Sequence, residues 1–157
     1  MEHPVIIDLK DTPDFIPTLA VWHQAEWASL NPGESLEQRI ARMGRYLSDD
    51  ALPRMFVWVE DGQPLGTAAF VASDMSTRPE WGPWLAAVYV KADCRGRGIG
   101  ATLVQHVASH AAAAGFSELF LFTPSKAHYY AKRGWQTLSQ EDYRGQAVTV
   151  MKRGLQA

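Results

Sequence analysis

The chain is poor in cysteine and has no excess of charge of either sign. Cys94 is the only cysteine in 157 residues, which excludes an internal disulfide bond and a metal cluster held by several thiolates. A lone thiol also fits a reducing compartment. Lysine and arginine number 15 against 17 acidic residues, for a net charge of −2. This balance argues against a broad nucleic-acid-binding surface, so any anion site has to be local.

Long apolar runs are missing as well. No stretch approaches the roughly 18 apolar residues of a membrane-spanning helix. The opening sequence, MEHPVIIDLK, lacks the basic start and the long apolar core of a signal peptide. Hydrophobic residues make up 46% of the chain and charged residues 20%, which argues against disorder. We therefore expect a cytoplasmic protein with no membrane and no nucleic-acid partner, folded as one domain over residues 1–157.

Hydrophobic periodicity predicts both strands and helices. Strands are expected at residues 3–10, 54–61, 66–73, 84–90, 118–123, 135–140 and 147–153. Helices are expected after the cap residues Thr12 and Ser35, and also between Gly98 and Gly115 and between Thr123 and Gly134. The stretch WLAAVYV, residues 84–90, lacks alternation, as a central strand covered on both faces does. The order is mixed α/β, with a strand–helix–strand unit at residues 84–123.

The segment VYVKADCRGRGIG, residues 88–100, connects the central strand to the following helix. A helix that begins near Gly98 presents unpaired backbone N–H groups and a partial positive charge to the loop before it. Glycines let the backbone turn there and let a ligand approach without Cβ atoms in the way. Lys91, Arg95 and Arg97 add positive charge. These features predict a site for phosphates, whereas a tight turn that uses glycine only for its geometry leaves the arginines unexplained.

Three phosphate-binding loops compete for this segment. A P-loop ends in Gly-Lys-Ser/Thr, and GIGATL has no lysine there. The dinucleotide fingerprint G-x-G-x-x-G/A is formally met at residues 96–101. However, five residues separate it from the strand, and the next strand ends in Thr123 rather than in an acidic residue. The third pattern, R-x-x-G-x-G, is met by Arg95, Gly98 and Gly100.

The wider segment VYVKADCRGRGIGATLV, residues 88–104, resembles the acetyl-CoA-binding motif of the GNAT superfamily of N-acetyltransferases. A second segment, HYYAKRGW at residues 128–135, is similar to the family's aromatic-Tyr-x-x-x-Gly-aromatic sequence. The two segments follow in the family's order, and the resemblance covers about residues 55–152. It implies an α/β (α+β) fold with a single GNAT-like domain. The expected sheet is mixed, mostly antiparallel and twisted, with about six to seven strands and about four flanking helices.

The resemblance also implies how acetyl-CoA binds. Backbone groups of Val88, Tyr89 and Val90 would pair with the pantetheine arm as though it were another strand. The loop residues that would hold the pyrophosphate are Arg95, Gly96, Arg97, Gly98, Ile99, Gly100 and Ala101. Many family members carry a cofactor-contacting asparagine at the position of Thr123. A β-bulge in the central strand often frees an amide to polarise the thioester carbonyl; this sequence permits a bulge but does not locate it.

Tyr130 aligns with the tyrosine that the family uses as general acid, and a phenol with a pKa near 10 stays protonated at neutral pH. Its alternative role is packing on an amphipathic helix, which we expect for Tyr129. A general base is not evident, because WLAAVYV contains no carboxylate. Asp74, Glu80 and Glu26 are the candidates in nearby segments, each also consistent with an ordinary solvated acid.

The remaining histidines and tryptophans indicate no further site. His106 and His110 have the spacing of helical metal ligands, but no third ligand is evident, so we expect solvated histidines and no metal. Four tryptophans lie where the family borders its acceptor pocket or packs its core, namely Trp22, Trp27, Trp81 and Trp84. Together with the three candidate acids, such aromatic walls could attract a cationic amine.

The resemblance therefore predicts an acetyl-CoA-dependent N-acetyltransferase. It would move an acetyl group directly from acetyl-CoA to a primary amine of a small molecule or peptide, through a ternary complex that gains rate from proximity. The alternative is a non-catalytic acyl-CoA-binding or sensing domain of the same fold, which the missing strand carboxylate favours and Tyr130 disfavours. A dimer is common in the family, so the resemblance makes a homodimer possible, but the sequence does not reveal the oligomeric state.

Overall fold

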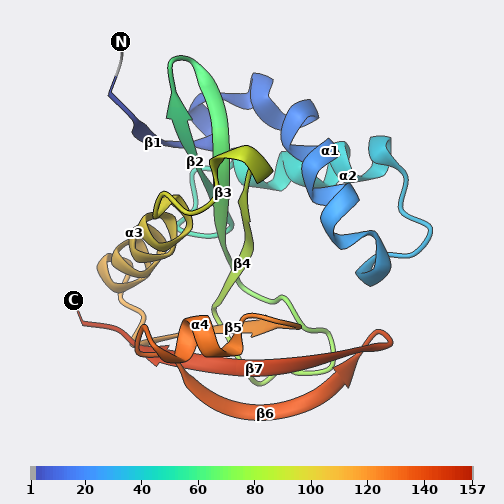
Figure 1. Cartoon of the computed structure of the whole chain (residues 1–157), viewed down its shortest axis with the longest axis vertical. Helices are drawn as coiled ribbons and strands as arrows, with labels where there is room; N and C mark the ends of the chain where they lie inside the picture. The colour runs from blue at the N-terminus through green and yellow to red at the C-terminus, as the bar shows by residue number, and fades with distance from the viewer. Residues whose placement is uncertain (1–2, 157) are drawn as a thin grey trace.

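The computed structural model describes residues 3–156 and places seven strands in one mixed sheet (Figure 1). The strands are β1 (Val5–Asp8), β2 (Arg54–Glu60), β3 (Gln63–Val71), β4 (Trp84–Val90), β5 (Glu118–Thr123), β6 (Gln136–Tyr143) and β7 (Gln146–Gly154). Their order across the sheet is β1-β2-β3-β4-β5-β7-β6. Only the β4–β5 pair is parallel, so the predicted mixed, mostly antiparallel sheet of six to seven strands is confirmed for the described residues.

Four α-helices accompany the sheet within the same part of the chain, as predicted. They are α1 (Ile16–Trp27), α2 (Leu36–Met43), α3 (Ile99–Ala113) and α4 (Ala127–Ala131). Short 3-10 helices occupy Leu9–Asp11, Pro13–Phe15, Ala28–Leu30, Gly44–Leu47 and Ala92–Cys94. In Figure 1, α1 and α2 lie on one side of strands β2 to β4 and α3 lies on the other, so the central strands are covered on both faces.

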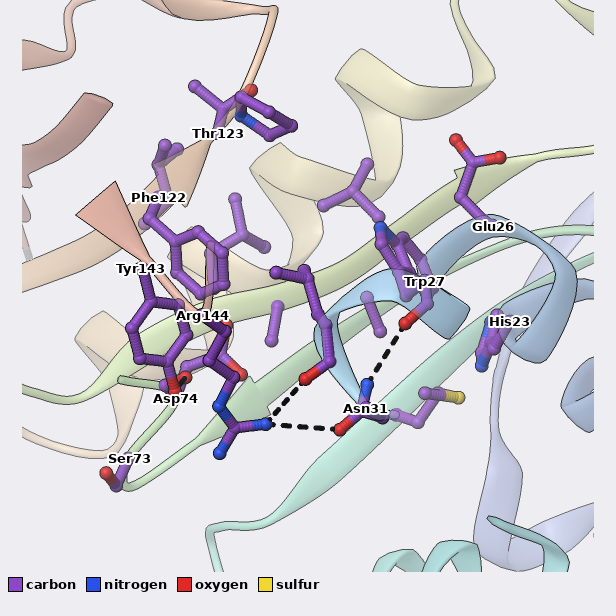
Figure 2. A pocket seen from close by; sticks show the side chains of 18 of the residues that line it. His23, Glu26, Trp27, Asn31, Ser73, Asp74, Phe122, Thr123, Tyr143 and Arg144 are labelled. Atoms are coloured by element: carbon purple, nitrogen blue, oxygen red, sulfur yellow. Dashed lines mark hydrogen bonds between the residues drawn. The ribbon is translucent and has the colours of Figure 1, made fainter. Parts of the chain in front are cut away.

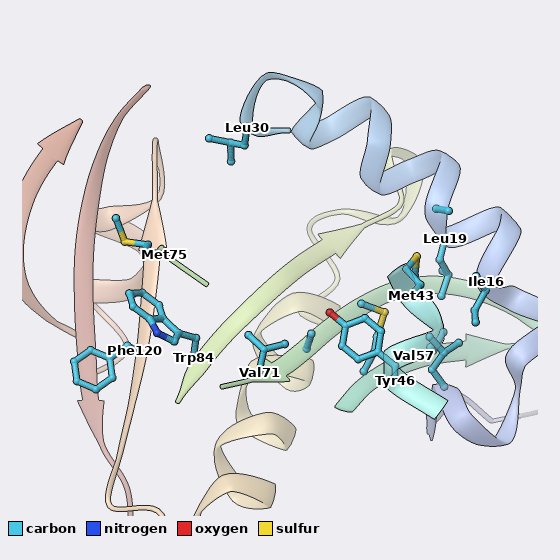
Figure 3. Close-up of a cluster of buried hydrophobic side chains, with 14 of the residues drawn as sticks. Ile16, Leu19, Leu30, Met43, Tyr46, Val57, Val71, Met75, Trp84 and Phe120 are labelled. Carbon is cyan, nitrogen blue, oxygen red and sulfur yellow. The ribbon is translucent and has the colours of Figure 1, made fainter. Parts of the chain in front are cut away.

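Two hydrophobic clusters hold these layers together. One packs α1 and α2 on the sheet through side chains that include Leu19, Met43 and Val57, and it continues to Trp84 and Phe120 at the far half of the sheet (Figure 3). The other packs α3 on the opposite face. Trp84 is fully buried, so the expected packing role applies to this tryptophan. Because both faces of β4 are covered, its side chains do not alternate between apolar and polar.

Strand β4 separates from β5 and carries a bulge. The two strands form a single register pair, Trp84 with Phe120, and diverge beyond it. Residue 67 of β3 pairs with residue 89 of β4, and residue 69 pairs with residue 86. Four residues of β4 therefore lie opposite three residues of β3, so β4 contains one extra residue. Ala87 has a φ of 51°, the left-handed region that an alanine rarely adopts. The sequence permits this bulge, and the structure locates it at Ala87.

Two of the four predicted helix starts hold, those at Ser35 and Gly98. Ser35 and Gln38 form the expected capping box, with the Ser35 hydroxyl accepting from the Gln38 amide at 3.1 Å. The prediction that Thr12 caps the first helix is wrong. Pro17 has no N–H to donate, so the chain before it winds as 3-10 turns and α1 begins only at Ile16. The Thr12 hydroxyl is left buried without a hydrogen bond among the described residues.

Candidate active site

The glycine loop leads from the end of β4 into the open N-terminus of α3. Gly98 is the N-cap residue, with a φ of 80°, and no side chain caps the helix there. Gly96 also has a positive φ, 83°. No atom lies within 4 Å of where a Cβ would stand at either glycine, so both face open space. The unpaired amides of the first helical turn are therefore accessible, as the binding of a diphosphate requires.

The two loop arginines have different partners. The Arg95 side chain folds back, so that its Nε donates to the Val90 carbonyl oxygen at 2.8 Å and its guanidinium lies over the Tyr89 ring. Arg97 Nη2 donates to Glu60 Oε1 at 2.7 Å, and this hydrogen bond lowers the pKa of the Glu60 carboxyl. Both contacts anchor the loop to the sheet. Backbone amides with adjacent cationic side chains are the donor set that fits the diphosphate of coenzyme A.

A cavity of about 460 Å³ lies where β4 and β5 diverge (Figure 2). From the sheet, it is lined by residues 85–88 of β4, which include the bulge, and by residues 121–126 at the end of β5. Tyr130 of α4 also lines it. The opposite wall comes from α1, α2 and the 73–76 loop. Such a volume suits a small molecule. Loop residues 95–100 are not part of the cavity wall, so the phosphate-binding loop and the cavity are separate regions.

Tyr130, the predicted general acid, is buried on the wall of the cavity. Its side chain is 8% exposed and lines the cavity. Burial raises the pKa of its hydroxyl to about 12, with a smaller contribution from Tyr129. The raised pKa keeps this hydroxyl protonated at neutral pH, so it can donate a proton or a hydrogen bond. Tyr129 instead lies under the Arg133 guanidinium, with 3.7 Å between the guanidinium carbon and the ring centroid.

The prediction that Thr123 caps the helix is wrong, because Lys126 has a non-helical φ of −114° and α4 begins only at Ala127. Thr123 instead stabilises the bend between β5 and α4. Its hydroxyl oxygen accepts from the Lys126 amide at 2.9 Å and from the Ser125 amide at 3.4 Å. Thr123 is buried and lines the cavity. Since the hydroxyl hydrogen is not used in these two bonds, a donor remains available on the cavity side of β5.

Sequence reasoning missed a series of hydrogen bonds that supports the bulge. His23 of α1 is 2% exposed, and its Nε2 lies 3.0 Å from Thr67 Oγ1. Thr67 in turn donates its only hydroxyl hydrogen to the Ala87 carbonyl oxygen at 2.8 Å. The Nε2 atom must therefore donate to Thr67, which leaves the lone pair on Nδ1. The available signal was a histidine one turn after Leu19 and Ala20, on the buried face of α1.

The predicted acids separate into two groups. Asp74 and Glu26 line the cavity, whereas Glu80 forms an ion pair with Arg78 at 3.2 Å and does not. Burial raises the pKa of the Asp74 carboxyl to about 6, although Arg45 and two further arginines lower it. Figure 2 shows Asp74 and Glu26 at different ends of the cavity.

The tryptophans also divide between site and core. Trp27 lines the cavity, while Trp22 stacks on Tyr89 with ring centroids 5.5 Å apart. The side chain of Tyr89 is thereby fixed between α1 and Arg95. Trp81 stacks on Phe120 at 5.9 Å, away from the cavity wall.

The cavity carries arginines that the sequence reasoning did not place there. Arg39, Arg42 and Arg45 come from α2 and the turn after it, and Arg144 comes from the tip of the β6–β7 hairpin. Arg144 Nη1 donates to the Leu30 carbonyl oxygen at 2.8 Å and lies 3.4 Å from Asn31 Oδ1. In Figure 2 these bonds join the hairpin to the segment after α1 across the cavity.

The two histidines on α3 have contacts of their own. Within residues 3–156, no group of three or more side chains could hold a metal ion. His106 is exposed and lies against Phe56, with ring centroids 4.5 Å apart. The expectation of a solvated histidine is wrong for His110, because its Nε2 lies 2.8 Å from the Ala51 carbonyl oxygen and its ring packs on Phe56 and Phe70.

Comparison with known proteins agrees with this architecture. The acetyltransferase (GNAT) family matches the chain over residues 16–135, so the chain belongs to that family. An acetyltransferase structure from Salmonella typhimurium with its cofactor acetyl-CoA is 18% identical, with a TM-score of 0.73 over 99% of this chain and 96% of that one. A GNAT acetyltransferase from Streptococcus pneumoniae is 15% identical, with a TM-score of 0.72 over 98% and 99%.

A GCN5-related N-acetyltransferase from Rhodopseudomonas palustris is 23% identical, with a TM-score of 0.71 over 99% of this chain and 98% of that one. These similarities show the fold, and family membership makes the chain an acetyltransferase that uses acetyl-CoA. No helix within residues 3–156 has the length and apolar character needed to span a membrane.

Proposed function

We propose that the chain transfers the acetyl group of acetyl-CoA directly to a primary amine that binds in the cavity beside β4. The observation that carries this proposal is the divergence of β4 from β5 at a bulge, with Tyr130 on the wall of the resulting cavity. A non-catalytic acyl-CoA sensor would need the open strand edge. It would not need a buried, protonated hydroxyl beside a cavity of about 460 Å³.

Different segments beside β4 bind different parts of acetyl-CoA. Amides of residues 95–101 hold the diphosphate at the N-terminus of α3. Backbone groups of Val88, Tyr89 and Val90 bind the extended pantetheine arm, and Thr123 offers its hydroxyl from β5. Acetyl-CoA supplies an acetyl group activated as a thioester, whose transfer to an amine releases a thiol. The bulge at Ala87 turns backbone polar groups away from the regular β3–β4 ladder, so that one amide can polarise the acetyl carbonyl.

Two side chains move the protons. Tyr130 donates its hydroxyl proton to the departing sulfur and is later reprotonated by solvent. Asp74 accepts the proton of the incoming amine, because its pKa of about 6 leaves it ionised at neutral pH yet more basic than an exposed carboxylate. The His23–Thr67 pair is a positioning device, since it holds the carbonyl group of the bulge.

A ligand panel tests the proposal. We expect acetyl-CoA, but not NAD or ATP, to raise the melting temperature by several degrees, since ligand at a hundredfold excess over Kd contributes about 2.7 kcal/mol. A screen of amines for thiol release then separates an enzyme from a sensor. Stabilisation by NAD or ATP without acetyl-CoA would reject both functions, and acetyl-CoA binding without amine-dependent thiol release would favour the sensor.

A further inference from the structure

The lining of the cavity is strongly cationic. Its cationic side chains are Arg39, Arg42, Arg45, Lys126 and Arg144, against two acidic ones, Glu26 and Asp74. The chain as a whole has a net charge of −2, so this concentration is local. Since residues 95–100 do not line the cavity, these cations do not belong to the phosphate-binding loop. They point to a second anion, on the other substrate.

Arg39 has a buried hydrogen-bond donor without a partner. The residue is 5% exposed, and its Nη2 makes no hydrogen bond within residues 3–156. Its Nε lies 3.0 Å from Glu34 Oε1, close enough for an ion pair but without hydrogen-bond geometry. Glu34 is shared, because its other oxygen lies 3.1 Å from the Nε of Arg42. One carboxylate therefore serves two guanidinium groups.

The neighbouring arginines already have partners. Arg45 Nη2 donates to the Tyr46 hydroxyl at 2.9 Å, and Arg144 Nη1 donates to the Leu30 carbonyl oxygen. Arg39 differs from both in its unused buried donor. An unsatisfied buried donor is costly. Arg39 lines the cavity, and an oxyanion that approaches its guanidinium there would form a charge-assisted hydrogen bond. The burial also lowers the pKa of the Arg39 guanidinium, in keeping with an environment that lacks a full counter-charge.

Arg39 lies in the same cavity as the bulge of β4. Arg39 is close enough to His23 for its charge to contribute to lowering the pKa of the imidazole. His23 is joined through Thr67 to the carbonyl of Ala87 at the bulge. Arg39 and residues 85–88 of β4 line the same cavity, so an oxyanion bound by Arg39 shares this cavity with the amine that reacts at the bulge. Both groups then belong to one small acceptor, because the cavity has a volume of about 460 Å³.

From this geometry we propose that the acceptor is an amine that also carries an oxyanion, such as an α-amino acid or its phosphonate analogue, and that Arg39 binds the oxyanion. The proposal rests on the proposed acetyltransferase function and names its substrate class. Arg39 is a specificity determinant in this account. It contacts the acceptor but takes no part in proton transfer.

Matched acceptor pairs test the inference. The thiol-release assay is run with L-α-amino acids, with the corresponding amino acid amides, and with 1-aminoalkylphosphonates. These sets compare a carboxylate, a neutral group and a phosphorus oxyanion next to the same amine. We expect at least one acid or phosphonate to have a kcat/KM at least tenfold above that of its amide.

Variants assign that preference to Arg39. Arg39→Met should lower kcat/KM for the acid at least tenfold, mainly through KM, and leave the amide nearly unchanged. Arg39→Lys, which keeps the charge, should restore part of the preference. Arg153→Met removes one positive charge far along β7, where Arg153 donates to Gln105, and should have no effect on either acceptor. Melting temperatures of all variants with and without acetyl-CoA show whether they fold and bind the donor.

The outcomes separate this inference from the proposed function. Acetylation of amides as fast as acids, or an unchanged preference in folded Arg39→Met, overturns the inference and leaves the acetyltransferase function intact. Absence of acetyl-CoA binding to the wild-type protein overturns both. Binding of acetyl-CoA without acetylation of any amine, acid or amide also overturns both and leaves the sensor.

Discussion

His23 is neutral and buried beside two arginines, and its hydrogen bond to Thr67 determines its tautomer. Burial is the main reason that its pKa falls from the usual 6.5 to about 3, and the charges of Arg39 and Arg42 lower it further. Because the unfolded chain then binds more protons than the folded one between these two values, stability falls as the pH falls through 6.5.

This shift predicts a measurable pH dependence of stability. From pH 7 to pH 5, His23 should remove about 2 kcal/mol from the free energy of unfolding. His23→Phe cannot gain this proton, so its stability relative to wild type should improve by about that amount over the same interval. The raised pKa of Asp74 makes stability change with pH in the opposite direction. Asp74 is present in both proteins, so its contribution cancels from the difference between their free energies of unfolding. Urea unfolding at both pH values measures the difference, and a constant difference would contradict the account.

The proposed role of Asp74 predicts how activity depends on pH, with an acidic limb in which kcat/KM falls as the pH falls. If Asp74 accepts the amine proton, kcat/KM should fall below a pH of about 6, the pKa of its carboxyl in the folded protein. Asp74→Asn should lower kcat/KM at pH 7 at least tenfold and lose this limb. Glu26→Gln, which changes the other acid of the cavity, should keep it. Retention of the limb by Asp74→Asn would remove Asp74 from the mechanism.

Tyr130→Phe tests the proton donor. Loss of a general acid typically costs a factor of about 10² or more in kcat, and acetyl-CoA affinity should stay within a few-fold of wild type. Because the pKa of the hydroxyl is raised to about 12, wild-type activity should show no loss from its ionisation up to pH 10. Tyr129→Phe is the matched control for packing on α4. Wild-type turnover in Tyr130→Phe would leave this residue with a structural role only.

At the scale of elements, β3 and α3 approach each other closely at Gly66. A Cβ at this position would lie 3.0 Å from the Tyr89 carbonyl oxygen, 3.1 Å from Ile99 Cγ2 and 3.2 Å from Leu103 Cδ1. The glycine thus lets the first turn of α3 lie directly on the sheet, with the glycine loop beside the end of β4.

Gly66→Ala should disturb this contact. We expect a loss of about 1–3 kcal/mol of stability, as for other insertions into a packed core, and weaker acetyl-CoA binding because the start of α3 is displaced. Gly44→Ala is a suitable control, since nothing lies within 4 Å of where its Cβ would stand and its φ is negative. Thermal unfolding and calorimetry measure both effects, and an acetyl-CoA affinity equal to wild type would show that α3 tolerates the shift.

Most elements could be predicted because local signals determine them. The Ser35–Gln38 capping box and the glycines that end α3 and α4 act within a few residues of the sequence. The bulge at Ala87 could not be placed, because it depends on how β4 pairs with β3 and no residue type marks it. The predicted start of α1 is too early because Thr12 and Pro13 also suit the 3-10 turn that they form.

At the scale of the whole molecule, the cavity is assembled from segments distant in sequence. The motif residues near β4 and Tyr130 could be predicted, because the family pattern fixes them locally. The arginines could not, since Arg39 belongs to a short amphipathic helix and an arginine there is normally solvated. Arg144 reaches the cavity only through the hairpin contact with Leu30, 114 residues away. A homodimer remains a prediction.

The central claim is that the N-terminus of α3 binds the diphosphate of acetyl-CoA. Gly98→Glu and Gly115→Glu form a matched pair for testing it, because both glycines have positive φ, face open space and flank the same helix. Each variant bears similar backbone strain, but only the first places a carboxylate at the proposed phosphate site.

Titration calorimetry of acetyl-CoA into wild type and both variants is the most direct measurement. We predict at least a tenfold loss of affinity for Gly98→Glu, about 1.4 kcal/mol or more, and little change for Gly115→Glu. Equal affinities in all three proteins would contradict the account, because the diphosphate would then bind elsewhere.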